Sequence, residues 1–143
     1  MIVSTKGRYA LRVMIDLAEH PGEAYIPLRE IAERQEISEK YLESILKKLV
    51  REKLVVGLRG KGGGYRLSRR PEQYTVGEIL RAAEESLSPV TCLEDKNYQC
   101  PRAAGCRTLP MWKQLDKLVH DFFDGITIDQ LMVGEKAGND YVI

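Results

Sequence analysis

Cysteine is almost absent from this 143-residue chain, which has only three, Cys92, Cys100 and Cys106, all within one short stretch. Three thiols cannot all pair with one another as disulfides, and the chain opens with neither a secretory leader nor a long apolar run. We therefore expect a cytoplasmic protein that does not cross a membrane. In a reducing compartment, grouped thiolates usually hold a metal ion or an iron-sulfur cluster.

Histidine is also scarce, since only His20 and His120 occur. An enzyme with a thiolate nucleophile is the alternative use of the cysteines, with His120 as its base. Such an enzyme needs an imidazole placed to activate one thiolate and a loop that binds an oxyanion, and the sequence indicates neither. The pattern favours a protein that is not an enzyme.

Charge is unevenly distributed, although the net value is only +1. The first 70 residues have 15 Lys and Arg against 9 Asp and Glu, a net charge of +6, and the remaining 73 have 7 against 12, a net charge of −5. With 43% hydrophobic residues, the chain can build one compact domain, or one domain with an oligomerisation arm. The basic first half predicts contact with a polyanion.

Three amphipathic segments occupy the first third of the chain. We predict helices at about 5–19 and 28–35, and a third that begins after Ser38, whose hydroxyl can cap it. Two short helices joined by a tight turn, the second with a polar and basic outer face, have the form of a helix-turn-helix. That outer face carries Glu39, Lys40, Glu43, Ser44, Lys47, Lys48 and Arg51. The inward residues, at helical spacing, are Ala10, Val13, Met14, Leu17, Leu28, Ile31, Ala32, Leu42, Ile45, Leu46 and Leu49.

A β-hairpin is predicted directly after these helices, with strands at 54–59 and 65–68 and a glycine-rich connection between them. The hairpin turns the helix-turn-helix into a winged helix, in which Arg59, Lys61 and Arg66 supply positive charge for DNA. Solvated charges on a plain turn are the simpler alternative. A nucleotide-binding phosphate loop does not fit, because a strand and not a helix follows the glycines.

The second half combines a short helix, the cysteine loop and a long helix. Thr75 to Glu78 form a capping box for a helix from Val76 to about Glu85. After the loop, a helix that Gly125 ends carries apolar residues at spacings of three and four: Trp112, Leu115, Val119 and Phe122. We predict that this stripe forms a dimer, the alternative being packing on its own domain. Thr127 caps a short helix through Leu131. The chain then divides into a winged helix-turn-helix domain (1–88), a cysteine ligand loop (89–108), a dimerisation helix with the short helix after it (109–131) and a C-terminal tail (132–143).

Four motifs occur in order along the chain: residues 4–10 (STKGRYA), Ile37-Ser38 followed by Tyr41-Leu42-Glu43, Arg59-Gly60 followed by Gly62-Gly63-Gly64-Tyr65, and the three cysteines followed by Trp112. In these motifs the chain resembles the IscR-like winged-helix transcription regulators. The resemblance implies a mainly α fold with a small β-hairpin wing and a long dimerisation helix. It also implies a homodimer whose long helices cross antiparallel.

For DNA, the resemblance implies a recognition helix at about 39–50 and a wing that places Arg59 near the minor groove. We expect the dimer to bind a pseudo-palindromic double-stranded operator. The residues predicted at the DNA are Ser38, Lys40, Tyr41, Glu43, Ser44 and Lys47 from the helix, with Arg59 and Lys61 from the wing.

For the cysteines, the resemblance implies that all three ligate an iron-sulfur cluster, [2Fe-2S] or [4Fe-4S], that adjusts DNA binding. Two departures occur. Seven residues separate Cys92 from Cys100, where the family typically has five, and Leu109 stands where the family has a histidine ligand. Some relatives use an acidic residue near position 8 of the partner chain, but this chain has Arg8. Glu94, Asp95, a partner-chain group or a small thiol remain as fourth ligands, and zinc is the alternative occupant.

We therefore predict a dimeric, cluster-sensing repressor of genes for iron-sulfur or cysteine and sulfur metabolism. The alternative is a repressor of cysteine metabolism that acts through a complex with cysteine synthase, its cysteines holding zinc or serving as redox thiols. The last residues favour this partner, because Asp140-Tyr141-Val142-Ile143 resemble the tails by which serine acetyltransferases dock into cysteine synthase. A tail packed on its own dimer through Tyr141 and Val142 is the competing interpretation.

Overall fold

Helix α1 (Thr5–Glu19) lies at the centre of the fold, with α2 (Leu28–Gln35), α3 (Glu39–Arg51) and α4 (Val76–Ala83) packed against it. The computed structural model describes residues 3–22, 24–84, 86–95, 97 and 99–132. The inward residues predicted for the first three helices are all buried or half-buried. The bounds predicted for α1 and α2 are also confirmed.

The helix-turn-helix is built by α2 and α3. Glu36 links them with a left-handed backbone, φ 55°, and its N–H donates to the last carbonyls of α2. Ser38 then caps α3, because its hydroxyl accepts a hydrogen bond from the Tyr41 N–H at 3.1 Å. Arg12 of α1 holds the same turn by donating to the carbonyl of Gln35 at 2.7 Å. The turn therefore fixes the angle at which α3 leaves the body.

One buried charge fixes α2 against α1. Asp16 is 3% exposed, and its two carboxylate oxygens accept hydrogen bonds from Arg34 at 2.7 and 3.0 Å. Gln35 donates a third, at 2.8 Å. Burial alone would raise the pKa of Asp16, but these donors outweigh it and the pKa lies below its ordinary value.

The wing is an antiparallel pair of strands, β1 (Val55–Leu58) and β2 (Gly64–Leu67), in which Val55 pairs with Leu67. The bounds of both strands differ by about one residue from those predicted. The segment before α2 pairs with the hairpin through Ile26 and Tyr65. Gly64 has φ +152° and a Cβ there would overlap the Ile26 carbonyl, so this position requires glycine.

A buried tyrosine ties the wing to the helices. Tyr74 follows the 3-10 turn η1 (Pro71–Gln73), is fully buried, and donates from its hydroxyl to the Leu54 carbonyl at 2.7 Å. The same hydroxyl accepts from the N–H groups of Ser68 and Arg69, at 3.0 and 2.9 Å. The base of the hairpin is therefore held rigidly beside α3.

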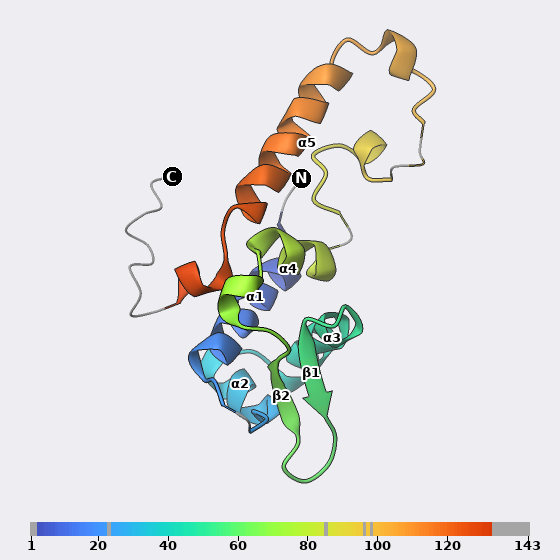
Figure 1. Ribbon diagram of the computed structural model, residues 1–143. Helices are drawn as coiled ribbons and strands as arrows, with labels where there is room; N and C mark the ends of the chain where they lie inside the picture. The colour runs from blue at the N-terminus through green and yellow to red at the C-terminus, as the bar shows by residue number, and fades with distance from the viewer. Residues whose placement is uncertain (1–2, 23, 85, 96, 98, 133–143) are drawn as a thin grey trace.

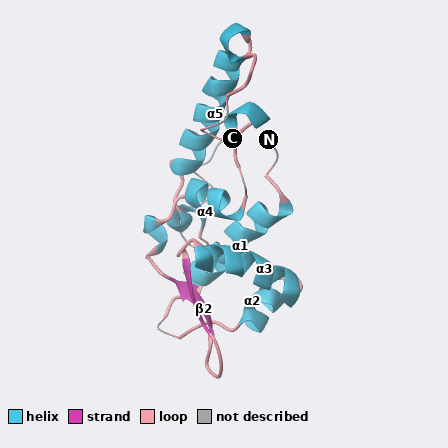
Figure 2. Ribbon diagram, turned by 90° about the vertical axis from the view of Figure 1, so that its right-hand side faces the viewer, coloured by secondary structure: helices cyan, strands magenta, loops and turns pink. Residues whose placement is uncertain are grey.

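The remaining elements are η2 (Thr91–Leu93), η3 (Ala103–Gly105), α5 (Leu109–Asp124) and η4 (Ile128–Leu131). Figures 1 and 2 show α5 extending from one end of the helical body, while the hairpin projects from the other. Thr75 caps α4 as predicted, but α4 ends two residues before Glu85. The short segment after Thr127 is a 3-10 helix. Among the described residues, no helix has the length and apolar character needed to span a membrane.

Candidate nucleic-acid interface and cysteine loop

The outer face of α3 carries the residues predicted at the DNA. Ser38, Lys40, Glu43 and Lys47 are exposed, and Tyr41 and Ser44 are half-buried. Tyr41 packs edge-on against Tyr9 of α1, with 5.8 Å between the ring centroids, and its carbonyl accepts from the Ser44 hydroxyl at 2.6 Å. These two side chains are thus held in place. Lys40 and Lys47 are exposed, and Lys47 lies 3.9 Å from the Glu43 carboxylate.

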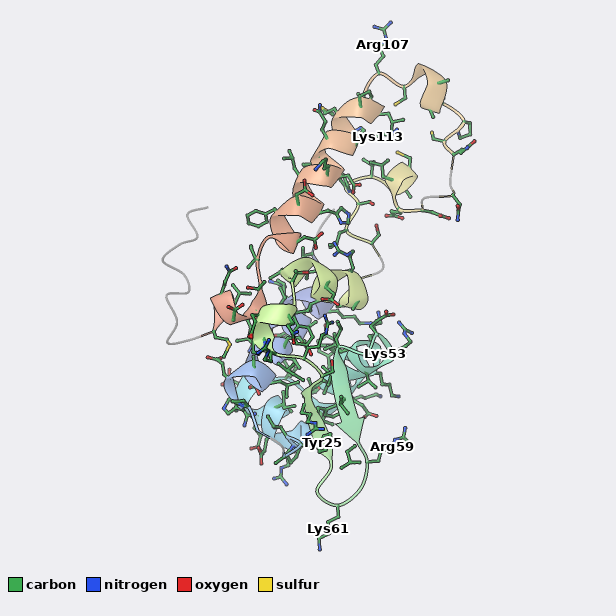
Figure 3. All side chains as sticks on the ribbon, viewed as in Figure 1. Tyr25, Lys53, Arg59, Lys61, Arg107 and Lys113 are labelled. Atoms are coloured by element: carbon green, nitrogen blue, oxygen red, sulfur yellow. The ribbon has the colours of Figure 1, made fainter. Side chains whose placement is uncertain are left out.

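A groove of about 740 Å³ separates α3 from the wing. Glu43 and Lys47 line it from α3, and Arg59 and Gly60 line it from the wing. Lys61 lies at the tip of the hairpin and Arg59 on its side (Figure 3). Gly60 and Gly62 have φ of +92° and +77°, conformations that let the tip turn tightly without a side chain in the way. A helix and a basic hairpin on the two sides of one groove suit a major groove and its neighbouring minor groove.

Two apolar residues in this groove were not predicted at the site. Val50 of α3 is 37% exposed and Leu58 of β1 is 48% exposed, and both line the groove. Burial along β1 does not alternate, since Val55 is buried and both Gly57 and Leu58 are exposed, so the exposure of Leu58 could not have been read from the strand period. Exposed apolar groups at a DNA interface can contact thymine methyl groups.

The three cysteines are spread along the loop between α4 and α5. All are half-buried free thiols, with Cys92 in η2 and Cys106 directly after η3. A hydrogen bond with the Thr108 side chain lowers the pKa of Cys106, and the two side-chain atoms are 3.5 Å apart. Among the described residues, no three His, Cys, Asp or Glu side chains lie close enough to hold a metal ion. In the part of the loop that the structure describes, the three thiols therefore do not converge on one point.

Helix α5 has two different faces. Its exposed face carries Met111, Leu115, Leu118 and Phe122, which are 51%, 38%, 66% and 55% exposed. Of the predicted dimerisation residues, Leu115 and Phe122 belong to this exposed stripe. Trp112 and Val119 are half-buried on another part of the helix. Met111 and Leu118 were missed, although the spacing of four, three and four residues could have revealed them.

The base of α5 is attached to α4 by charge. Arg81 donates to both carboxylate oxygens of Asp124, at 2.7 and 3.4 Å, and its Nη1 lies 3.1 Å from Nδ1 of His120. His120 is half-buried and lies between Arg81 and Asp116. His20, in contrast, is exposed at the end of α1. The predicted tail residues Tyr141, Val142 and Ile143 lie outside the described residues.

Comparisons with known proteins agree with this arrangement. Residues 3–134 match the family model Rrf2, described as an iron-dependent transcriptional regulator. The HTH-type transcriptional regulator IscR of Aliivibrio salmonicida is 40% identical over 137 residues, 96% of this chain and 80% of that protein. IscR of Sodalis glossinidius is 38% identical over 136 residues, 95% of this chain and 81% of that protein.

Solved structures of related regulators have a similar fold. CymR, the global cysteine regulator of B. subtilis, superposes with a TM-score of 0.71 at 37% identity and covers 92% of this chain and 95% of its own. T. potens IscR gives a TM-score of 0.70 at 33% identity and covers 100% of this chain and 93% of its own. The winged helix-turn-helix fold predicted from the sequence is thereby confirmed.

Proposed function

The chain belongs to the Rrf2 family of transcriptional regulators, and on that premise we propose that it is a homodimeric repressor whose DNA binding responds to an iron-sulfur cluster on its cysteine loop. As a DNA-binding regulator of this family it is not an enzyme. We propose genes of iron-sulfur or of cysteine and sulfur metabolism as its targets, since its relatives include both IscR and a global cysteine regulator.

The groove between α3 and the wing is the observation that carries the proposal. Glu43 and Lys47 of α3 face Arg59 of the hairpin across it, in the half of the chain with a net charge of +6. Lys61 lies beyond the groove, at the tip of the hairpin (Figure 3). A duplex seated there would meet α3 in its major groove and the hairpin in the adjacent minor groove. Ser38, Lys40, Tyr41, Glu43, Ser44 and Lys47 are the proposed contacts from α3.

The exposed stripe of α5 supports a dimer. Met111, Leu115, Leu118 and Phe122 are large and apolar, and they line one side of a helix that extends from the body (Figure 1). A second copy of the same helix would cover this stripe with matching spacing. Two chains joined in this way present two recognition helices, and a pseudo-palindromic operator mirrors that symmetry.

The donor set of the loop suits an iron-sulfur cluster. Cys92, Cys100 and Cys106 are free thiols within 15 residues, and the chain has no further cysteine to compete with them. Ligation requires the three thiols to come together, and the length of the loop permits this. When bound, the cluster supplies a redox-sensitive centre that ties three points of the loop together. Zinc bound by the same thiols is the alternative occupant.

A second candidate function rests on the likeness to CymR, the global cysteine regulator of B. subtilis, at 37% identity. In that case the tail that ends in Tyr141, Val142 and Ile143 would dock through its carboxylate into cysteine synthase. Deleting Ile143 should then abolish capture of a cognate cysteine synthase and leave DNA affinity unchanged. Equal capture of the full-length and truncated chains in a calorimetric titration would remove this candidate.

The main proposal is tested by comparing the DNA affinity of the anaerobically purified protein with that of the same protein after chelation. Genomic fragments that the protein selects supply the operator. A change in affinity that disappears when Cys92, Cys100 and Cys106 are all replaced by Ser is the expected result. Equal affinities before and after chelation would contradict a cluster-responsive regulator.

A further inference from the structure

The groove between α3 and the wing contains two exposed apolar side chains. Among the described residues, six large apolar side chains are exposed, and four of them form the α5 stripe. The other two, Val50 of α3 and Leu58 of β1, both line this groove. We propose that Val50 and Leu58 contact thymine methyl groups of the operator and thereby help to select its sequence. This inference rests on the proposed binding of a duplex in the groove.

Val50 reaches the groove on the face of α3 that also carries Glu43 and Lys47. These three residues follow one another at spacings of four and three, which places them on one side of a helix. Opposite Val50, strand β1 has Gly57, where an added Cβ would lie 3.7 Å from Cγ2 of Val50. Because Gly57 has no side chain, it leaves the side chain of Val50 uncovered, and Val50 is 37% exposed.

Leu58 is uncovered for a similar reason. Its partner across the hairpin is Gly64, which has no side chain, whereas directly opposed side chains normally pack against each other in an antiparallel pair. A larger residue does not fit at Gly64, because its Cβ would overlap the Ile26 carbonyl. Leu58 is 48% exposed as a result. Glycines therefore leave apolar surface open on both sides of the groove.

A DNA duplex matches both the charge and the apolar surface of this groove. Lys47 and Arg59 line it together with Val50 and Leu58, so a fitting ligand combines negative charge with apolar groups. DNA has phosphates, and thymine is the base that presents a methyl group in the major groove. Contact between that methyl group and Val50 or Leu58 is favourable, because both apolar surfaces leave water.

The deoxyribose of the DNA strand is the competing apolar surface, and a contact with it would carry no sequence information. Val50 lies on the helix that is proposed to enter the major groove, on the same face as Lys47, and this position favours the base edge. The two contacts differ in one measurable respect, because only contact with the base depends on the thymine methyl group.

The test uses the full-length protein and an operator fragment that it selects from genomic DNA, in a mobility-shift assay at fixed salt. Each thymine is replaced in turn by uracil, which removes the methyl group and keeps the base pair. We expect wild type to bind about fourfold more weakly when a contacted thymine becomes uracil, which is the effect of one buried methyl group. A variant that combines Val50→Ala with Leu58→Ala should bind the thymine operator more weakly and no longer distinguish it from the uracil operator.

Lys61→Ala is the matched control, because Lys61 lies at the tip of the same hairpin (Figure 3). It should weaken binding to both operators by the same factor and keep the difference between them. The inference is overturned if no uracil substitution changes the affinity of wild type, a result that needs no variant protein. It is also overturned if the difference between thymine and uracil persists in the combined variant, and equal weakening of both operators would then indicate a deoxyribose contact. A protein that selects no DNA fragment would instead overturn the proposed function.

Discussion

Arg81 of α4 donates hydrogen bonds to both carboxylate oxygens of Asp124 of α5, at 2.7 and 3.4 Å. The pair joins the DNA-binding body to the helix that begins where the cysteine loop ends. On its other side, α4 accepts a hydrogen bond at the Ala83 carbonyl from Lys48 of α3, at 3.4 Å. Helix α4 therefore lies between α3 and α5 and contacts both.

Gly77→Ala tests how tightly α4 and α5 are joined. Alanine normally stabilises a helix interior by about 0.5–1 kcal/mol relative to glycine, but here the added Cβ would overlap the Asp124 carboxylate that Arg81 holds. We expect the gain to be absent in the wild-type background and restored in an Asp124→Ala background, a coupling of roughly 0.5 kcal/mol or more. Thermal unfolding at one protein concentration measures this, and additive effects would show that α4 and α5 are not held together there.

Asp16→Asn should destabilise the body by about 3 kcal/mol, because Arg34 loses its buried partner. The folded pKa of Asp16 is depressed below its ordinary value of 3.8, so the stabilisation is present above that pH and is lost as the pH falls through the folded pKa. In urea titrations, the free energy of unfolding of wild type should fall more steeply below about pH 4 than that of the variant. Asp121→Asn, on the exposed face of α5, is the control, and parallel pH curves for wild type and Asp16→Asn would contradict the assignment.

These two predictions show what sequence patterns can and cannot supply. The starts of α1 and α2 were predictable because local signals mark them: Ser4 caps α1 through its side chain, and Pro27 directly precedes α2. The burial of Asp16 was not, since its partners Arg34 and Gln35 are on another helix and only the packing angle brings them together. The same holds for Tyr74, whose three hydrogen bonds join segments distant in sequence.

The residues of the candidate site also differ in how far the sequence could predict them. Helical periodicity placed the outer residues of α3, because they depend on the period of one element. Arg59 was placed by the position of the glycine-rich hairpin directly after the helix-turn-helix. Helical periodicity alone gave the stripe Trp112, Leu115, Val119 and Phe122, whereas in the structure Met111 and Leu118 are exposed and Trp112 is half-buried.

Replacing the wing cations tests the DNA interface. Arg59→Ala should weaken operator binding by about 1–3 kcal/mol if it reads a groove, and Lys61→Ala should lower affinity for all sequences and reduce the salt dependence by about one ion. Lys113→Ala is the matched control, because Lys113 lies on α5, far from the wing (Figure 3). A mobility-shift assay at fixed salt measures these effects. Unchanged affinity when Arg59 and Lys61 are both replaced by Ala would exclude the wing from the DNA interface.

Charge placed in the α5 stripe should separate the dimer. Leu118→Glu and Phe122→Glu introduce a carboxylate where a second helix would pack, and each should shift sedimentation toward the monomer while the circular dichroism stays the same. Leu58→Glu is the control, since Leu58 is 48% exposed on the wing and should leave the oligomeric state unchanged. A Leu118→Glu protein that sediments like wild type would place the interface elsewhere.

The most direct test of the central claim is the metal and sulfide content of the anaerobically purified protein, measured beside a variant with Ser at Cys92, Cys100 and Cys106. We expect iron and acid-labile sulfide in equal amounts with a visible chromophore, all absent from a variant that is still folded and dimeric. Stoichiometric zinc without iron, or a chromophore that survives in the triple variant, would contradict it.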